Sequence, residues 1–108
     1  METKKHVLAP QEQRLLEVMQ AVNFGRIDNI EIKGGRPVIN ADWKMIRTIR
    51  IGRENGPRPE LEKQDFVLKA RQVEIFEHIR SLRDGARIMV CVQHGLPEWI
   101  YVTEERQI

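Results

Sequence analysis

The fold of this chain is decided by Phe24-Gly-Arg-Ile-Asp-Asn-Ile-Glu-Ile-Lys-Gly-Gly-Arg-Pro-Val-Ile39, a stretch that recurs in outline 60 residues later as Asp84-Gly-Ala-Arg-Ile-Met-Val-Cys-Val-Gln-His-Gly-Leu-Pro-Glu-Trp99. Each stretch holds a glycine, a run in which every second residue is isoleucine or valine, a turn glycine and a proline. Alternation with a period of two predicts a strand with one buried side, and the glycine after it predicts a tight turn. Each stretch is therefore expected to form a β-hairpin.

Each hairpin follows a segment with the spacing of an amphipathic helix. The first helix begins at Pro10 and ends at Gly25, which suits the preference for proline in the first turn and glycine after the last. The second begins between residues 60 and 65 and ends at Asp84-Gly85. The apolar positions expected to face the core are Leu15, Val18, Met19 and Val22 in the first helix, and Phe66, Ala70, Val73, Phe76, Ile79 and Leu82 in the second.

The two helix–hairpin units align without a gap when the sequence is shifted by 60 residues. The matches fall at positions with demanding backbone geometry, namely Gly25 with Gly85, Gly35 with Gly95, and Pro37 with Pro97. Any helix–hairpin unit needs a glycine stop and a glycine turn, which explains the residue types but less easily the equal spacing. One unit alone buries too little surface to be stable. We therefore expect a duplication whose halves share one core.

The expected fold class is α+β, with two helix–β-hairpin repeats that form one mostly antiparallel sheet of four to five strands and two helices packed on one face. All 108 residues are expected to form a single domain. One repeat unit spans about 10–40, the second spans about 65–103, and an insertion occupies 41–64. Within the insertion, the β-branched residues between Met45 and Ile51 favour a third strand.

Composition indicates a soluble protein of a reducing compartment. Hydrophobic residues make up 41% and charged residues 31% of the chain, enough to fill a compact core and to cover its surface. No apolar run approaches the roughly 18 residues that a membrane span needs, and the first residues lack the apolar region of a secretory signal. The single cysteine, Cys91, cannot form an internal disulfide. We therefore expect a cytoplasmic protein with no membrane contact.

Each hairpin is surrounded by a short set of residues, and the Thr-Glu ending of the second set is missing from the first unit. The two sets comprise Phe24-Gly25, Ile30, Ile32 and Gly35 in the first unit, and Val90, Val92, His94-Gly95 and Thr103-Glu104-Glu105 in the second. This arrangement resembles the small YezD-type domain of bacteria, over about two thirds of the chain. The chain departs from that family at Asp84, where an aromatic residue is expected, and in having two units instead of one. The resemblance implies a fold and brings no established activity.

The middle of the chain is locally basic. Residues 33–58 hold seven basic side chains and two acidic ones, whereas the net charge of the whole chain is only +2. The candidate nucleic-acid-binding residues are Lys44, Arg47, Arg50, Arg53 and Arg58. Arginines bind phosphates as bidentate donors, but a spacing of three on a strand places successive side chains on opposite faces. Such charges also protect an edge strand against aggregation. Nucleic-acid binding is therefore the alternative function.

Trp99 and Tyr101 share one face of the last predicted strand. They are expected to form either a protein-interaction patch or core packing beneath a helix. We accordingly expect a binding or adaptor module that acts through self-association, as a homodimer, or through a protein partner.

No enzyme chemistry emerges from the residue pattern. Cys91 and His94 supply two of the four ligands that a structural zinc site needs. Glu74 lies one helical turn before His78, which gives a carboxylate–imidazole pair on the surface without a nucleophile or metal beside it. We therefore expect no catalytic residue, no metal and no cofactor.

Overall fold

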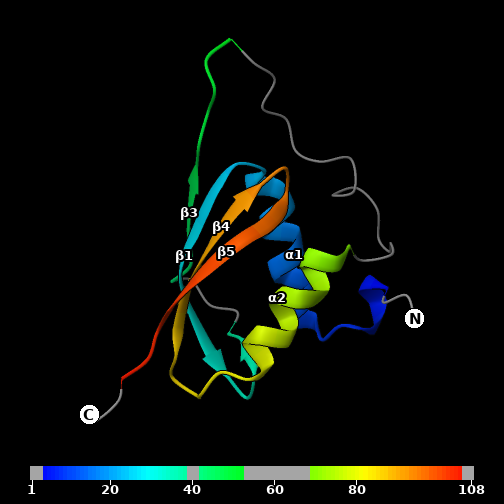
Figure 1. Ribbon diagram of the computed structural model, residues 1–108, viewed down its shortest axis with the longest axis vertical. Helices are drawn as coiled ribbons and strands as arrows, with labels where there is room; N and C mark the ends of the chain where they lie inside the picture. Colours follow the sequence, from blue (N-terminus) through cyan, green and yellow to red (C-terminus); the bar gives the residue numbers. More distant parts are fainter. Residues whose placement is uncertain (1–3, 39–41, 53–68, 106–108) are drawn as a thin grey trace.

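The computed structural model describes residues 4–38, 42–52 and 69–105 (Figure 1). Its elements, in chain order, are the 3-10 turn η1 (Lys5–Val7), α1 (Pro10–Val22), β1 (Gly25–Lys33), β2 (Arg36–Pro37), β3 (Lys44–Arg47), α2 (Ala70–Arg80), β4 (Arg87–Gln93) and β5 (Leu96–Thr103). The described residues thus form an α+β fold with two α-helices and an antiparallel sheet, as the sequence predicts, and the sheet is curled. None of the described helices is long and apolar enough to cross a membrane.

The long strand β1 organises the sheet. The strand order is β2–β1–β4–β5, and β3 pairs with β1 as well. Since residues 25–27 pair with both β3 and β4, these two strands lie on opposite edges of β1. All four pairings are antiparallel, and β2 pairs with the far end of β1 at residues 32–33. One nine-residue strand therefore joins three neighbours.

A bulge in β1 places the isoleucine side chains of both halves of this strand on the core side of the sheet. Ile27 and Ile30 are both fully buried although they lie three positions apart, because one extra residue enters β1 between their partners in β4. Asn29 in the bulge has a φ of 63°, which asparagine adopts more readily than most residues. Its side-chain oxygen accepts a hydrogen bond from Arg87 at 2.8 Å. Alternation alone would place Ile27 on the solvent side.

Both helices and the central strands contribute to one hydrophobic core. Its fully buried members include Leu15, Leu16 and Met19 of α1, Ile79 of α2, Ile27, Ile30 and Ile32 of β1, and Val90 of β4. These side chains follow the three-and-four spacing of a helix and the period of two of a strand. The aliphatic residues of the two halves are thus buried together.

The two helices begin in the same way. The carboxylate of Glu12 accepts a hydrogen bond from the backbone N–H of Ala9 at 3.0 Å, and the amide oxygen of Gln72 accepts one from that of Lys69 at 2.8 Å. Both Glu12 and Gln72 are buried. Glu12 also binds Arg80 of α2, with 3.0 Å between Oε2 and Nη2. This ion pair ties the start of α1 to the end of α2.

The predicted start of the second helix is wrong. Lys69 is in an extended conformation, with φ −77° and ψ 158°, and α2 begins only at Ala70. Ala70, predicted on the buried face, is exposed at the first position of α2, and the buried side of this first turn holds Gln72 instead. Phe66, predicted on the same buried face, lies outside the described residues.

The third strand is present but shorter than predicted. β3 covers Lys44–Arg47, whereas a strand was expected to reach Ile51. Its partner β1 begins at Gly25, opposite Arg47, and among the described residues one further backbone hydrogen bond follows, from Thr48 N–H to Phe24 O at 2.8 Å. Beyond it, residues 48–52 extend away from the body of the protein (Figure 1).

Candidate binding surface

The face of the sheet opposite the buried isoleucines and valines carries the exposed aromatic side chains. The strand registers align Ile46 of β3, Arg26 of β1, Cys91 of β4 and Trp99 of β5 in one row. In the next row, Lys44 pairs with Asp28, and Met89 pairs with Tyr101. We call these eight side chains the outer face. They come from four strands that are far apart in the sequence.

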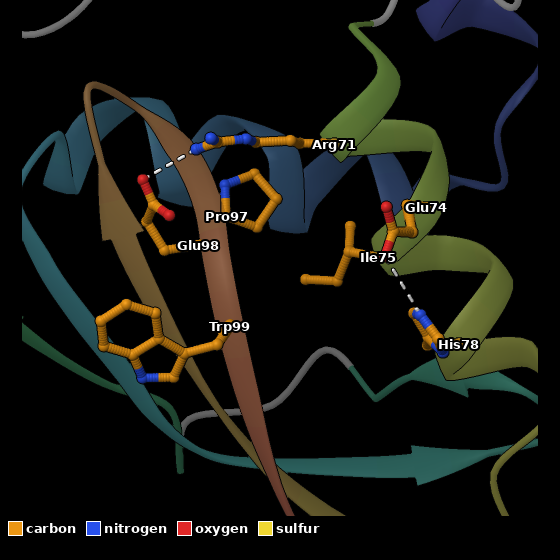
Figure 2. A pocket seen from close by; sticks show the side chains of 7 residues that line it. All are labelled: Arg71, Glu74, Ile75, His78, Pro97, Glu98 and Trp99. Atoms are coloured by element: carbon orange, nitrogen blue, oxygen red, sulfur yellow. Dashed lines mark hydrogen bonds and ion pairs between the residues drawn. The ribbon is translucent and has the colours of Figure 1, made fainter.

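Trp99 and Tyr101 are half exposed on the outer face, with 51% and 55% of their surfaces accessible. Figure 2 shows Trp99 on the side of β5 that points away from α2. The two aromatic residues therefore do not pack beneath a helix, which was one of the two expectations for them. They offer a solvent-exposed surface instead.

A groove of about 280 Å³ lies at one end of the outer face. Phe24, Arg50 and Trp99 are among the side chains that line it. The guanidinium carbon of Arg50 lies 4.2 Å from the centre of the Phe24 ring, in a cation–π contact. The other partner of Phe24 is His94, which meets it edge to face with 4.8 Å between ring centres. These contacts hold the Phe24 ring at the rim of the groove.

Gly25 allows the groove to form. Its φ of 142° is one that side-chain-bearing residues rarely adopt, and a Cβ atom there would collide with the backbone oxygen of Ile46. The absence of a side chain therefore lets β3 lie close against β1. The result places Ile46, Thr48 and Arg50 along one wall of the groove.

The thiol of Cys91 also lines this groove. Burial raises the pKa of Cys91 above its ordinary value of 9.0, while a side-chain hydrogen bond with Trp99 and the charge of Arg26 act in the opposite direction. A thiol with a raised pKa stays protonated at neutral pH and is a poor nucleophile. Cys91 therefore contributes an apolar surface to the groove.

The structure distributes the predicted basic residues over both faces of β3. Lys44 lies on the outer face and Arg50 lines the groove, whereas Arg47 pairs with Gly25 and points to the opposite face. Arg53 and Arg58 lie outside the described residues. The basic segment, as far as it is described, thus does not form one continuous face.

Two further residues of the surface, Arg26 and Phe24, were not among the predicted binding residues. Arg26 stands between Ile46 and Cys91 in the row, and its Nε lies 3.2 Å from Asp28 Oδ1 in an ion pair without hydrogen-bond geometry. Phe24 follows the end of α1, where it reads as part of a helix stop. Their outward direction depends on strand pairing, and for Arg26 it depends on the bulge at Asn29, because alternation from Ile30 and Ile32 alone would turn Arg26 inward.

A second hollow, of about 200 Å³, lies between α2 and the start of β5 (Figure 2). Arg71 of α2 reaches across it to Glu98 of β5, with 2.7 Å between Nη1 and Oε1. The expected carboxylate–imidazole pair is present on α2, with 3.4 Å between Glu74 Oε2 and His78 Nε2, and both side chains are exposed. The residues that line this hollow include no hydroxyl or thiol nucleophile. In the described part of the chain, no group of three or more metal-ligating side chains is brought together.

Comparisons with protein-family models, with curated proteins and with solved structures found no match to this chain.

Proposed function

We propose that this chain is a non-enzymatic binding module that holds a protein partner on the outer face of its sheet. The observation that carries the proposal is the half-exposed Trp99 beside a groove with Phe24 and Arg50 on its rim. Tryptophan, tyrosine, phenylalanine, methionine and arginine are the residues that protein interfaces favour, and the outer face and its groove contain all five.

The groove defines the chemistry of the partner. Ile46 and Trp99 supply apolar contact, and Arg26 and Arg50 supply guanidinium groups at its border. Glu98, which also lines it, is already bound by Arg71. A complementary segment therefore carries a bulky apolar side chain next to a carboxylate, which a guanidinium binds by charge-assisted hydrogen bonds.

A selection from a random peptide library tests this proposal. Peptides selected on the native chain should be rich in an aromatic or aliphatic residue next to Asp or Glu. Their affinity should fall at least about tenfold for Trp99→Ser and for Arg50→Glu, as for a residue at the centre of an interface. Lys33→Glu is the matched control, because it makes the same charge change at an exposed residue of the first hairpin. Equal binding by all four proteins would refute the proposal.

Single-stranded nucleic acid is the second candidate ligand. Lys44, Arg26 and Arg50 stand near Phe24 and Trp99, and stacking of bases on aromatic rings within a basic groove is the usual mode of such binding. A fluorescently labelled oligonucleotide provides the test. Binding that weakens steeply with salt and is lost in Arg50→Glu supports nucleic acid, whereas binding that is absent or indifferent to salt excludes it.

We also propose that the two halves derive from one helix–hairpin unit of the YezD type. In support, α1 and α2 begin at positions 10 and 70, and Glu12 and Gln72 cap them alike. The pairing of β1 with β4 adds an independent argument. Its register sets Gly25 against Val92 and Ile27 against Val90, so that β1 meets its own counterpart antiparallel, as in a two-fold dimer. A single-unit YezD-type protein should then dimerise through its first strand, and a crystal structure with a monomer would contradict this.

A further inference from the structure

The sheet ends in β3 on one side and in β5 on the other. Within the described residues, no strand pairs with the outer edge of either one. β5 is eight residues long, and residues 48–52 prolong β3 away from the body (Figure 1). An open strand edge presents backbone N–H and C=O groups that another chain can pair with. The protein therefore has two sites for strand addition.

The exposed apolar side chains gather on these same two edges. Of the eight large hydrophobic residues exposed in the described chain, seven lie between Met45 and Ile51 or between Trp99 and Val102. Ile51 is the extreme case, with 94% of its surface accessible, and Ile49 follows with 61%. Such a concentration marks a surface that another protein covers.

The charges of the two edges are opposite. Residues 43–52 contain three basic side chains and no acidic one, whereas residues 96–105 contain three acidic side chains and no basic one. Pairing of β3 with β3, or of β5 with β5, would bring like charges together, which is unfavourable. Pairing of β3 with β5 brings opposite charges together and steers the encounter. The charge pattern thus selects a contact between unlike edges.

Strand direction is compatible with this contact. β3 and β4 are both antiparallel to β1, and β5 is antiparallel to β4, so β3 and β5 run in opposite directions within one sheet. When a second copy continues the sheet in the same orientation, its β5 lies antiparallel to β3 of the first copy. The buried faces of the two copies then lie on the same side of the continuous sheet. The register between β3 and β5 can therefore keep the apolar residues of both copies on that side.

We propose that copies of this chain associate head to tail, with the edge formed by β3 and residues 48–52 of one copy paired to the β5 edge of the next. This differs from the expected homodimer, because a head-to-tail contact leaves one open edge of each kind and grows until a ring closes. It goes beyond the binding of a partner on the outer face, because the strand edges and not the outer side chains carry it.

Two variants that block one edge each provide the test. Ile49→Glu with Ile51→Glu puts two carboxylates on the apolar part of the β3 edge, where they face the acidic β5 edge of the next copy, and Tyr101→Lys with Thr103→Lys puts two ammonium groups on the β5 edge, where they face the basic β3 edge. All four residues are exposed, so both variants should retain the circular dichroism spectrum of the native chain. The single substitutions Ile51→Glu and Tyr101→Lys are milder versions of the same test. Val7→Glu is the control, because Val7 is also exposed but lies on neither edge.

Sedimentation velocity gives the readout. The native chain and Val7→Glu should form oligomers whose size increases with protein concentration and which dissociate when salt is added. Each edge variant alone should be a monomer, and an equimolar mixture should associate, because the intact β5 edge of one variant meets the intact β3 edge of the other. A dimer of either variant alone, a mixture that stays monomeric, or a native monomer at about 1 mM would overturn the proposal. A native monomer that still binds the selected peptides would overturn the edge contact alone and leave the outer-face function standing.

Discussion

Replacing Glu12 by alanine should destabilise the protein by about 2 kcal/mol. The side chain is buried, with 3% of its surface exposed, and its two oxygens serve the backbone N–H of Ala9 and the guanidinium of Arg80. Loss of a helix cap costs about 1 kcal/mol. The pair with Arg80 adds about 1 kcal/mol and no more, because the arginine is 53% exposed and solvent screens its charge.

Two related variants separate these contributions. Glu12→Gln keeps an oxygen for the cap and removes the charge, so it should cost about 1 kcal/mol. Gln72→Ala removes the corresponding cap of α2, which is made by an uncharged amide, and should also cost about 1 kcal/mol. The comparison between positions 12 and 72 therefore measures what the link to Arg80 contributes.

Urea unfolding followed by far-ultraviolet circular dichroism measures all three variants. At a slope of about 1–3 kcal/mol per molar urea, Glu12→Ala should lower the unfolding midpoint by roughly 1 M, and the other two variants by about half as much. A slope equal to that of the native chain shows that the unfolded state has not changed. If Glu12→Ala costs no more than Gln72→Ala, the link between the helices contributes nothing and the reasoning fails.

Three further outcomes are expected. Gly25→Ala should lower the free energy of unfolding by more than about 2 kcal/mol and increase hydrogen exchange in β3, because the new Cβ atom collides with the backbone oxygen of Ile46. Hydrogen-exchange protection of β3 equal to that of the native chain would contradict this prediction. In the same urea assay, Asn29→Gly should leave the free energy of unfolding nearly unchanged, and Asn29→Ala should lower it by about 1 kcal/mol, because φ at this position is 63° and alanine rarely adopts such a value. Equal effects of the two substitutions would mean that the bulge relaxes. Burial raises the pKa of Cys91, so the folded state holds its proton more tightly than the unfolded state. The stability that the protonated Cys91 thiol contributes is complete below pH 9.0 and is lost as pH rises through the pKa of the folded state. Iodoacetamide should therefore modify the thiol of the native protein more slowly at pH 8 than the thiol of the urea-unfolded protein. Equal rates would refute the shift.

The hairpins were predictable because their signal is local. Alternation around Ile30 and Val90 with a glycine turn behind it needs no information from the rest of the chain, and both strands bury these residues. The bulge at Asn29 was not predictable, because an extra residue in one strand has meaning only against the partner strand. The start of α2 was misplaced for a related reason, since helical spacing continues in the sequence past the residue at which the backbone becomes extended.

The binding surface was predictable only in part. Trp99 and Tyr101 lie two positions apart on one strand, so their common face follows from the sequence alone. The groove joins Trp99 to Phe24 and Arg50, which lie on different segments and meet only after β3 pairs with β1. Lys44 and Arg47 show the opposite case. They belong to one basic segment of the sequence, but their side chains point to opposite faces of the sheet once β3 forms.

The position of β1 at the centre of the sheet constrains when the protein can fold. Its main partner β4 ends at Gln93, 60 residues after Lys33, and synthesis proceeds at about 5–20 residues per second. Roughly 3 to 12 s therefore pass between the synthesis of β1 and that of the strand that pairs with it. During that interval the isoleucines of the N-terminal half are protected from solvent only by α1 or by chaperones. A fragment released after translation stops between the two hairpins would expose these isoleucines.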